Sequence, residues 1–228
     1  MDYILINYGL PIIGVVITFL AQMYIKSNYN KYLKVRAQLG LRGCDVARKI
    51  LDKHGLRNVQ VNQISGELTD HYDPSKKTVN LSSDIYNGTS IASISVASHE
   101  CGHALQDKYG YKFMNIRSAL VPIVNFSTKI GYLVVMIGLM AGLLKIAWIG
   151  IILLLSMLLF QIVTLPVEFN ASSRALKEIE TEHIVNPDEL KGAKKMLTSA
   201  ALTYVAGMLS TLLQILRLAL SVMGRRRN

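Results

Sequence analysis

Long apolar runs without charge are the feature that most restricts the fold of this chain. The run from Tyr3 to Ile25 contains no charged residue, nor does the run from Ile146 to Val167, and Ala119 to Leu144 is apolar apart from Lys129. A helix of about 20 apolar residues, rising about 1.5 Å per residue, crosses the hydrocarbon core of a bilayer. The runs therefore predict a mostly α-helical membrane protein with an N-terminal transmembrane anchor and a transmembrane hairpin.

The start of the chain favours an uncleaved anchor over a secretory signal peptide. A signal peptide usually has a basic start, a shorter apolar core and a small-residue cleavage site. Here the chain starts with Met1-Asp2, and the basic residues from Lys26 to Arg36 follow the apolar run. Because basic residues tend to stay on the cytoplasmic side, we expect the N-terminus outside.

The basic balance of the chain indicates a lipid surface as partner. The formal net charge of +10 comes from 25 Lys and Arg against 15 Asp and Glu. These residues flank apolar runs and do not alternate with aromatic side chains, which favours anionic headgroups and argues against nucleic acid. Residues 26–118 hold most of them, so we expect this segment in the cytoplasm.

Cys44 and Cys101 are the only cysteines, and we expect no disulfide, in keeping with a reducing compartment.

His99, Glu100 and His103 form an HExxH motif. Histidines four residues apart share one face of a helix and can bind one zinc ion, while the glutamate is placed to take a proton from water at the metal. A helix over 91–108 is predicted, because Ser90 offers a capping hydroxyl and no proline interrupts the run. The alternative is a pair of histidines that make ordinary hydrogen bonds on a partly buried face. Two of only five histidines at this spacing around a glutamate favour the metal.

The residues before this motif predict a small α+β domain. An amphipathic helix is expected over 42–54, strands over 58–64 and 77–81, and a turn at 71–74. A sheet edge next to the HExxH helix can bind an extended peptide by main-chain pairing. A hairpin that only supports the helix explains the strands equally well, and both interpretations stay open.

Glu168 is the predicted third metal ligand. A catalytic zinc takes three protein ligands and keeps one position open, and the second span of the hairpin returns Glu168 to the level of the HExxH helix. The alternative is a carboxylate that only marks the membrane boundary. Asp73, Asp84 and Glu182 are weaker candidates, because no membrane span places them at that level.

The last third of the chain is mixed. Asn186-Pro187-Asp188 predicts the start of a helix, and 197–222 is apolar with a polar stripe. This helix either crosses the membrane, which places the basic residues 225–227 outside against the charge rule, or lies at the interface. The expected segments are an anchor (1–25), a cytoplasmic zinc-protease domain with the HExxH helix (26–118), a transmembrane hairpin (119–167), a cytoplasmic segment with the third ligand (168–198) and a C-terminal hydrophobic helix with a basic tail (199–228).

Together these motifs resemble a known family, the YugP-like bacterial membrane zinc metallopeptidases, which are distantly similar to HtpX and the eukaryotic prenyl-protein endopeptidases. The resemblance covers nearly the whole chain, in the segments 71–74, 79–82, 97–106, 165–172 and 200–206. It implies a zincin-like (gluzincin) catalytic domain in the bacterial inner or plasma membrane, one Zn²⁺ bound by His99, His103 and Glu168, and Glu100 as the catalytic base. The similarity to HtpX also suggests a role in quality control.

One position departs from the HtpX pattern. In HtpX an aspartate that orients a zinc-binding histidine stands where this chain has Ser172. Such partners fix the tautomer and orientation of the ligand, so Ser172, Asn170 or another group is expected to take the role. Tyr204, His71 and His183 are the candidate donors to the oxyanion, each with an ordinary structural role as the alternative.

The function predicted from these residues is hydrolysis of peptide bonds in membrane or membrane-proximal polypeptides at the cytoplasmic face. A catalytically silent zinc-binding membrane scaffold is one alternative, although a structural zinc usually has four protein ligands and no spare base. A metal-dependent amidase acting on a non-protein substrate is another. The natural substrate and the oligomeric state do not follow from the sequence.

Overall fold

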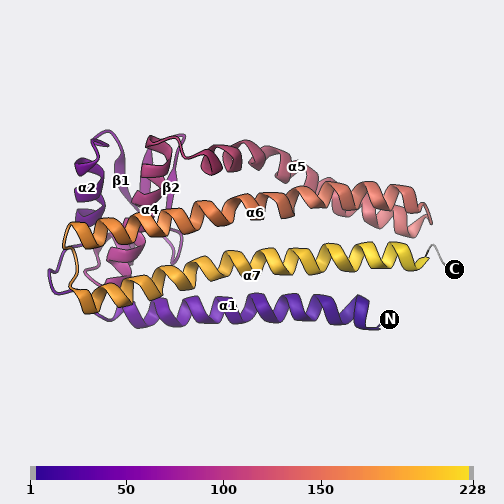
Figure 1. The fold of residues 1–228 in the computed structure, drawn as a ribbon, viewed down its shortest axis with the longest axis horizontal. Coiled ribbons are helices and arrows are strands. Elements are labelled where there is room, and N and C mark those ends of the chain that lie inside the picture. The colour runs from indigo at the N-terminus through magenta and orange to yellow at the C-terminus, as the bar shows by residue number, and fades with distance from the viewer. Residues whose placement is uncertain (1–3, 226–228) are drawn as a thin grey trace. The chain divides into compact units, whose positions relative to one another are not determined.

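The computed structural model describes residues 4–225, so the Met1-Asp2 start and the end of the basic tail, Arg226 and Arg227, lie outside the described residues. The chain divides into two compact units. We call the first, 1–22, 115–165 and 202–228, the helical unit, and the second, 23–114 and 166–201, the sheet unit. The elements in chain order are η1 Leu5–Gly9, α1 Leu10–Leu33, α2 Gly43–Lys53, β1 Gln60–Ile64, β2 His71–Asp73, β3 Thr78–Ser82, α3 Ser83–Asn87, α4 Ile91–Lys108, α5 Lys112–Met140, α6 Leu144–Thr181 and α7 Pro187–Arg225. Figure 1 labels most of them.

Four helices are long and apolar enough to cross a membrane: the continuous helix 5–33, α5, α6 and α7. The anchor and the hairpin are therefore confirmed as candidate spans, and α7 is a fourth, which the sequence left open. In the apolar stretch of 5–33 only 6% of the residues are buried inside the protein. Apolar helices with so little protein contact gain their burial from lipid, which matches a membrane protein.

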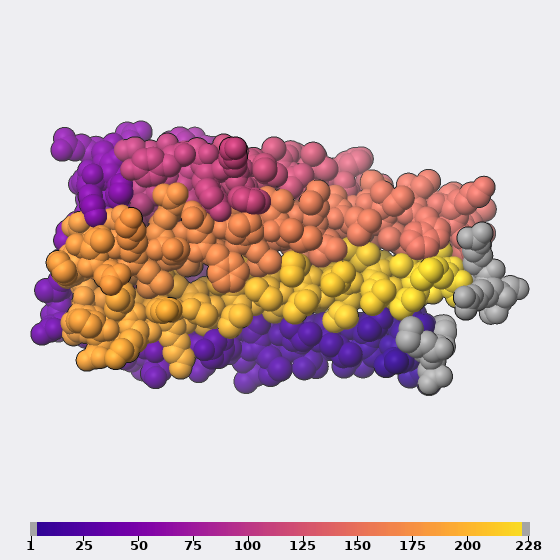
Figure 2. All heavy atoms as spheres, viewed as in Figure 1, coloured from indigo at the N-terminus to yellow at the C-terminus, as the bar shows by residue number. Residues whose placement is uncertain are grey.

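Small residues make the closest contacts inside the helical unit. A Cβ on Gly138 of α5 would lie 2.4 Å from the Ala147 nitrogen of α6, and one on Gly14 of α1 would lie 2.9 Å from Ser210 Oγ of α7. The yellow surface of α7 lies along the indigo surface of α1 in Figure 2. Apolar side chains gain little from leaving lipid for a helix interface, so close backbone packing holds such helices together.

The sheet has the order β1-β3-β2, and its pairing corrects the prediction. β1 and β3 pair in parallel, with Val61 opposite Val79, whereas a hairpin would make them antiparallel. The residues 71–73, predicted as part of a turn, form β2, which pairs antiparallel with β3 through Tyr72 and Val79. The hairpin is thus β2-β3, and the turn comes after Asp73. Tyr72 is buried, and its burial explains why this short segment pairs with β3.

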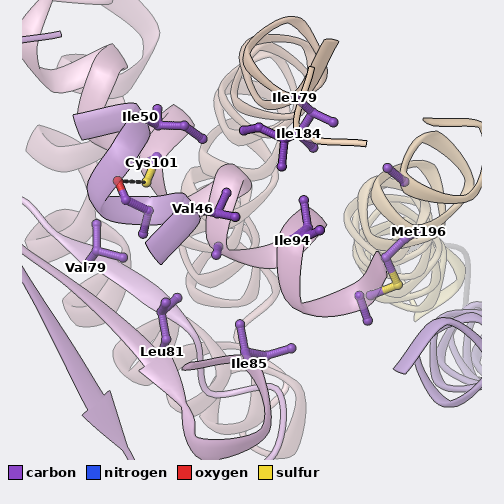
Figure 3. Close-up of a cluster of buried hydrophobic side chains, with 14 of the residues drawn as sticks. Val46, Ile50, Val79, Leu81, Ile85, Ile94, Cys101, Ile179, Ile184 and Met196 are labelled. Carbon is purple, nitrogen blue, oxygen red and sulfur yellow. Dashed lines mark hydrogen bonds between the residues drawn. The ribbon is translucent and has the colours of Figure 1, made fainter. Parts of the chain in front are cut away.

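The core of the sheet unit joins α2, α3, α4 and β3 to the end of α6 and the start of α7. Figure 3 shows Val46 and Ile50 of α2, Leu81 of β3 and Ile94 of α4 pointing into one cluster. Helix α2 was predicted from its amphipathic pattern and is confirmed within a residue at each end. Cys44 and Cys101 are buried free thiols.

Candidate metal centre

Helix α4 carries the HExxH motif and has local signals at both ends. The Ser90 hydroxyl accepts a hydrogen bond from the Ser93 amide at 3.0 Å, which caps the N-terminus. At the C-terminus Gly110 has φ +61°, and the Tyr111 amide donates to the Gln106 carbonyl at 2.9 Å. This is a Schellman ending, which favours glycine at the left-handed position. The helix runs over Ile91–Lys108, as predicted.

His99 and His103 of α4 meet Glu168 of α6. Glu168 Oε2 lies 3.3 Å from His99 Nε2 and 3.5 Å from His103 Nε2. One ligand atom from each of the three residues lies within 4.8 Å of the others, and among residues 4–225 this is the one group of three or more His, Cys, Asp or Glu with metal-binding spacing. Helix α6 brings in Glu168 from outside the HExxH helix, as predicted.

The distances from the Glu168 carboxylate to the two histidines fit zinc. Zinc bonds to imidazole nitrogen and carboxylate oxygen are about 2.0–2.2 Å long, so two ligands of a tetrahedral site stand about 3.3–3.5 Å apart. The two measured separations from Glu168 Oε2 are 3.3 and 3.5 Å. Two imidazoles and one carboxylate are also a donor set found in catalytic zinc sites, where water or substrate takes the fourth position.

Gly102, inside the motif, lets the backbones of α4 and α6 approach closely. A Cβ at Gly102 would lie 2.5 Å from the Ala171 carbonyl oxygen, a separation that real Cβ atoms do not adopt. Ala171 is one turn beyond Glu168 on α6, so the same approach brings the Glu168 carboxylate to the two histidines. The sequence reasoning missed this role of Gly102, because only the contact with α6 reveals it.

In both histidines of the motif, His99 and His103, the ring nitrogen Nδ1 has a hydrogen-bond partner. Ser172 Oγ lies 3.2 Å from His99 Nδ1, so Ser172 stands where the sequence predicted an orienting group. Gln106 Oε1 lies 3.0 Å from His103 Nδ1, a contact that the sequence reasoning missed. Its signal was the spacing of three residues on one helix, which places the two side chains on the same face. Asn170 contacts Gln106 rather than a histidine.

Glu100 is only 7% exposed. Burial raises the pKa of its carboxyl above the usual value, and the neighbouring imidazoles oppose that shift. A carboxylate with a raised pKa is a stronger base, and this suits proton transfer near neutral pH.

The remaining candidates are not members of the cluster with metal-binding spacing. Both ring nitrogens of His71 are in contact, Nδ1 with the Thr69 carbonyl at 2.8 Å and Nε2 with Asn80 Nδ2 at 3.2 Å. Tyr204 lies on α7 in the helical unit, and His183 is exposed in the turn after α6, so the oxyanion role of each stays a prediction.

The weaker candidates for the third ligand lie in other parts of the sheet unit. Asp73 accepts the amides of Ser75 and Lys76 in the turn after β2, and Glu182 pairs with Lys53 at 2.7 Å. Asp84 lies in the first turn of α3. The cluster with metal-binding spacing contains Glu168 and none of these three carboxylates.

Comparison with known proteins identifies the family of the chain. The family model described as "Putative neutral zinc metallopeptidase" matches residues 7–223. A curated protein of Bacillus subtilis (strain 168), named "Putative membrane protease YugP", is 45% identical over 217 residues, which cover 95% of this chain and 96% of that protein. No solved structure matches the chain. The chain therefore belongs to this family of membrane zinc metallopeptidases, and its cofactor is Zn²⁺.

Proposed function

We propose that this chain is an HExxH zinc endopeptidase of the gluzincin type, which cuts membrane or membrane-proximal polypeptides at the cytoplasmic face of the bacterial cell membrane. One observation carries the proposal: the Glu168 carboxylate lies 3.3 and 3.5 Å from the two histidines of the motif, while Glu100 lies next to His99 on the same helix. Three protein ligands leave a coordination position for substrate, whereas a structural zinc usually has four.

Zinc, when bound, polarises the scissile carbonyl and makes a water beside it more acidic. His99, His103 and Glu168 would hold the ion. Glu100 accepts the proton from the attacking water and then delivers it to the leaving amine nitrogen, so the peptide bond breaks with one water consumed. The buried setting of Glu100 supports this role, because few waters compete for its carboxylate.

The cytoplasmic orientation rests on charge. Basic residues are frequent from Lys26 to Arg117, a segment that includes α4, and the loop between α5 and α6 has Lys145 as its nearest basic residue. This asymmetry follows the positive-inside rule. A role in quality control of membrane proteins is part of the proposal through the resemblance to HtpX alone.

The test compares detergent-purified wild type with Glu100→Gln for zinc content and for cleavage of an unfolded protein. We expect both proteins to hold zinc and only the wild type to cut, since the substitution removes the base and keeps the three ligands. Glu180→Gln, an exposed change on α6, is the matched control and should cut like wild type. If wild type and Glu100→Gln both hold zinc and neither cuts any polypeptide, the scaffold alternative gains. Equal cutting by both would remove Glu100 from the mechanism.

A further inference from the structure

Behind His103 a chain of hydrogen bonds runs from α4 to α6. Gln106, whose side chain is fully buried, contacts His103 Nδ1 through Oε1 at 3.0 Å. Its amide nitrogen donates to the Val167 carbonyl at 2.7 Å and to Asn170 Oδ1 at 3.1 Å. Asn170 Oδ1 also accepts from Arg174 Nε at 2.8 Å. Every polar atom of the Gln106 side chain therefore has a partner.

Two groups fix the direction of every hydrogen bond in this series, because one of them can only accept and the other can only donate. A backbone carbonyl such as that of Val167 can only accept, and a guanidinium such as that of Arg174 can only donate. If Gln106 were turned over, its Oε1 would face two acceptors, the Val167 carbonyl oxygen and Asn170 Oδ1. Its Nε2 must therefore face both, and its Oε1 must face His103.

The fixed amide determines the tautomer of a neutral His103. An acceptor at Nδ1 requires the ring proton there, which leaves the lone pair on Nε2. Nε2 is the atom that lies 3.5 Å from Glu168 Oε2. The partner of His99 does not impose this choice, because the Ser172 hydroxyl can donate or accept.

We propose that Gln106, held in one orientation by Val167, Asn170 and Arg174, is a positioning residue that locks His103 with its proton on Nδ1 and its Nε2 toward the metal. The inference rests on the proposed ligand set of the zinc site. It assigns to Gln106 the task that a carboxylate or carbonyl performs behind other zinc-binding histidines.

The test measures zinc affinity by competition with a chromophoric chelator, together with the visible spectrum of the Co²⁺-substituted protein. Gln106→Met keeps the approximate size of the side chain and removes the acceptor. We expect its zinc dissociation constant to rise about 10- to 100-fold, the usual cost of losing such a partner, and the Co²⁺ bands to shift. Gln161→Met, the same change on α6 in the helical unit, is the control and should bind zinc like wild type.

Thermal unfolding of the metal-free protein shows whether Gln106→Met folds. If it folds poorly, a second pair of variants tests the relay, by which we mean the hydrogen bonds that link Arg174, Asn170, Gln106 and His103. Asp in place of Asn170 still accepts from Gln106 and Arg174, so Asn170→Asp should retain near wild-type zinc affinity. Asn170→Leu should weaken zinc binding, because the Gln106 amide loses its support. Equal affinity of Asn170→Asp and Asn170→Leu would overturn the relay, as would a folded Gln106→Met that binds zinc within about threefold of wild type, well below the usual effect.

These readouts separate the inference from the proposed enzyme activity. A wild type that binds zinc and cuts nothing counts against the protease, while the ratio of zinc affinities still decides the role of Gln106. A wild type that cuts, with Gln106→Met unchanged in zinc affinity and in Co²⁺ spectrum, keeps the protease and rejects the positioning role.

Discussion

Both units have an apolar core, but they differ in the large apolar side chains that they expose and in the charged groups that they bury. The helical unit exposes large apolar side chains such as Phe126 at 65% and Ile152 at 63%. The sheet unit buries polar ones, with Gln106 at 0% and Glu168 at 2% exposed. Lipid favours the first arrangement, whereas the second is stable only when buried polar groups find partners. The cluster with metal-binding spacing therefore belongs to the unit that bears the cost of burying charged groups.

Both units nevertheless use glycine for the same purpose. Gly102 brings α4 to α6 in the sheet unit, and Gly138 brings α5 to α6 in the helical unit, with missing Cβ positions 2.5 and 2.4 Å from backbone atoms. The contacts are equally close, yet only the first lies between the two helices that carry the proposed metal ligands. Substitutions at these two positions can therefore separate stability from metal binding.

The largest effect is expected at the third ligand. Glu168→Ala removes the one carboxylate of the cluster and leaves two histidines. We expect zinc affinity to fall by more than the ~10- to 100-fold seen when an outer partner is lost, and cleavage to fall to background. Competition with a chelator measures the zinc affinity, and a peptide cleavage assay measures the activity. Zinc binding unchanged by Glu168→Ala would place the third ligand elsewhere.

Gly102→Ala should come next. The new methyl group would meet the Ala171 carbonyl, so α4 and α6 must separate, and overpacking of this kind costs about 1–3 kcal/mol of stability. Because the separation also moves Glu168 away from His99 and His103, zinc affinity should fall as well. Thermal unfolding of the metal-free protein and zinc competition test the two effects. A loss of stability with full zinc affinity would show that the approach of the helices does not set the ligand geometry.

The matched change, Gly138→Ala, should lower stability without lowering zinc affinity. Its Cβ would meet the Ala147 nitrogen, and the cost is again about 1–3 kcal/mol. Thermal unfolding in detergent should show the loss, while chelator competition at a temperature where the variant is folded should match wild type. If Gly138→Ala weakened zinc binding as much as Gly102→Ala, the comparison between the two units would fail.

The two units also differ in how much of each follows from sequence. Helix α4 was predicted with its correct ends because Ser90 and Gly110 act locally. Glu168 was predicted as the third ligand because a catalytic zinc needs one, and the structure places it in the cluster with metal-binding spacing. The anchor and the two spans of the hairpin followed from composition alone, whereas the crossing of α7 stayed open. The parallel pairing of β1 with β3 could not be predicted, because it depends on which strands meet in the folded sheet.

Apart from the Gln106–His103 contact within α4, the parts of the site that the sequence did not supply are contacts made across helices. Nothing near Gly102 in sequence indicates that Ala171 lies against it, and the partners of Gln106 are 61 and 64 residues away. Each depends on the packing of α4 against α6. The α4–α6 interface therefore explains the geometry that the HExxH pattern by itself leaves unspecified.

The smallest predicted effect concerns the partly exposed ion pairs that Glu182 makes in the sheet unit. Glu182 lies 2.7 Å from Lys53 and 3.3 Å from Lys49, and these two ammonium groups hold its pKa below the usual value. A carboxyl with a lowered folded-state pKa adds stability above its unfolded pKa and loses it as the pH falls through the folded one. Wild type should therefore lose stability between about pH 5 and the acid limit, and Glu182→Gln should lose less over the same range.

Thermal unfolding across this pH series measures the difference between wild type and Glu182→Gln. The difference should be small and should shrink in 1 M salt, because partly exposed ion pairs are screened. Zinc affinity at neutral pH should be equal in the two proteins, since Glu182 is outside the ligand cluster. Parallel stability curves for the two proteins would mean that the lysines stabilise the folded chain no more than water does.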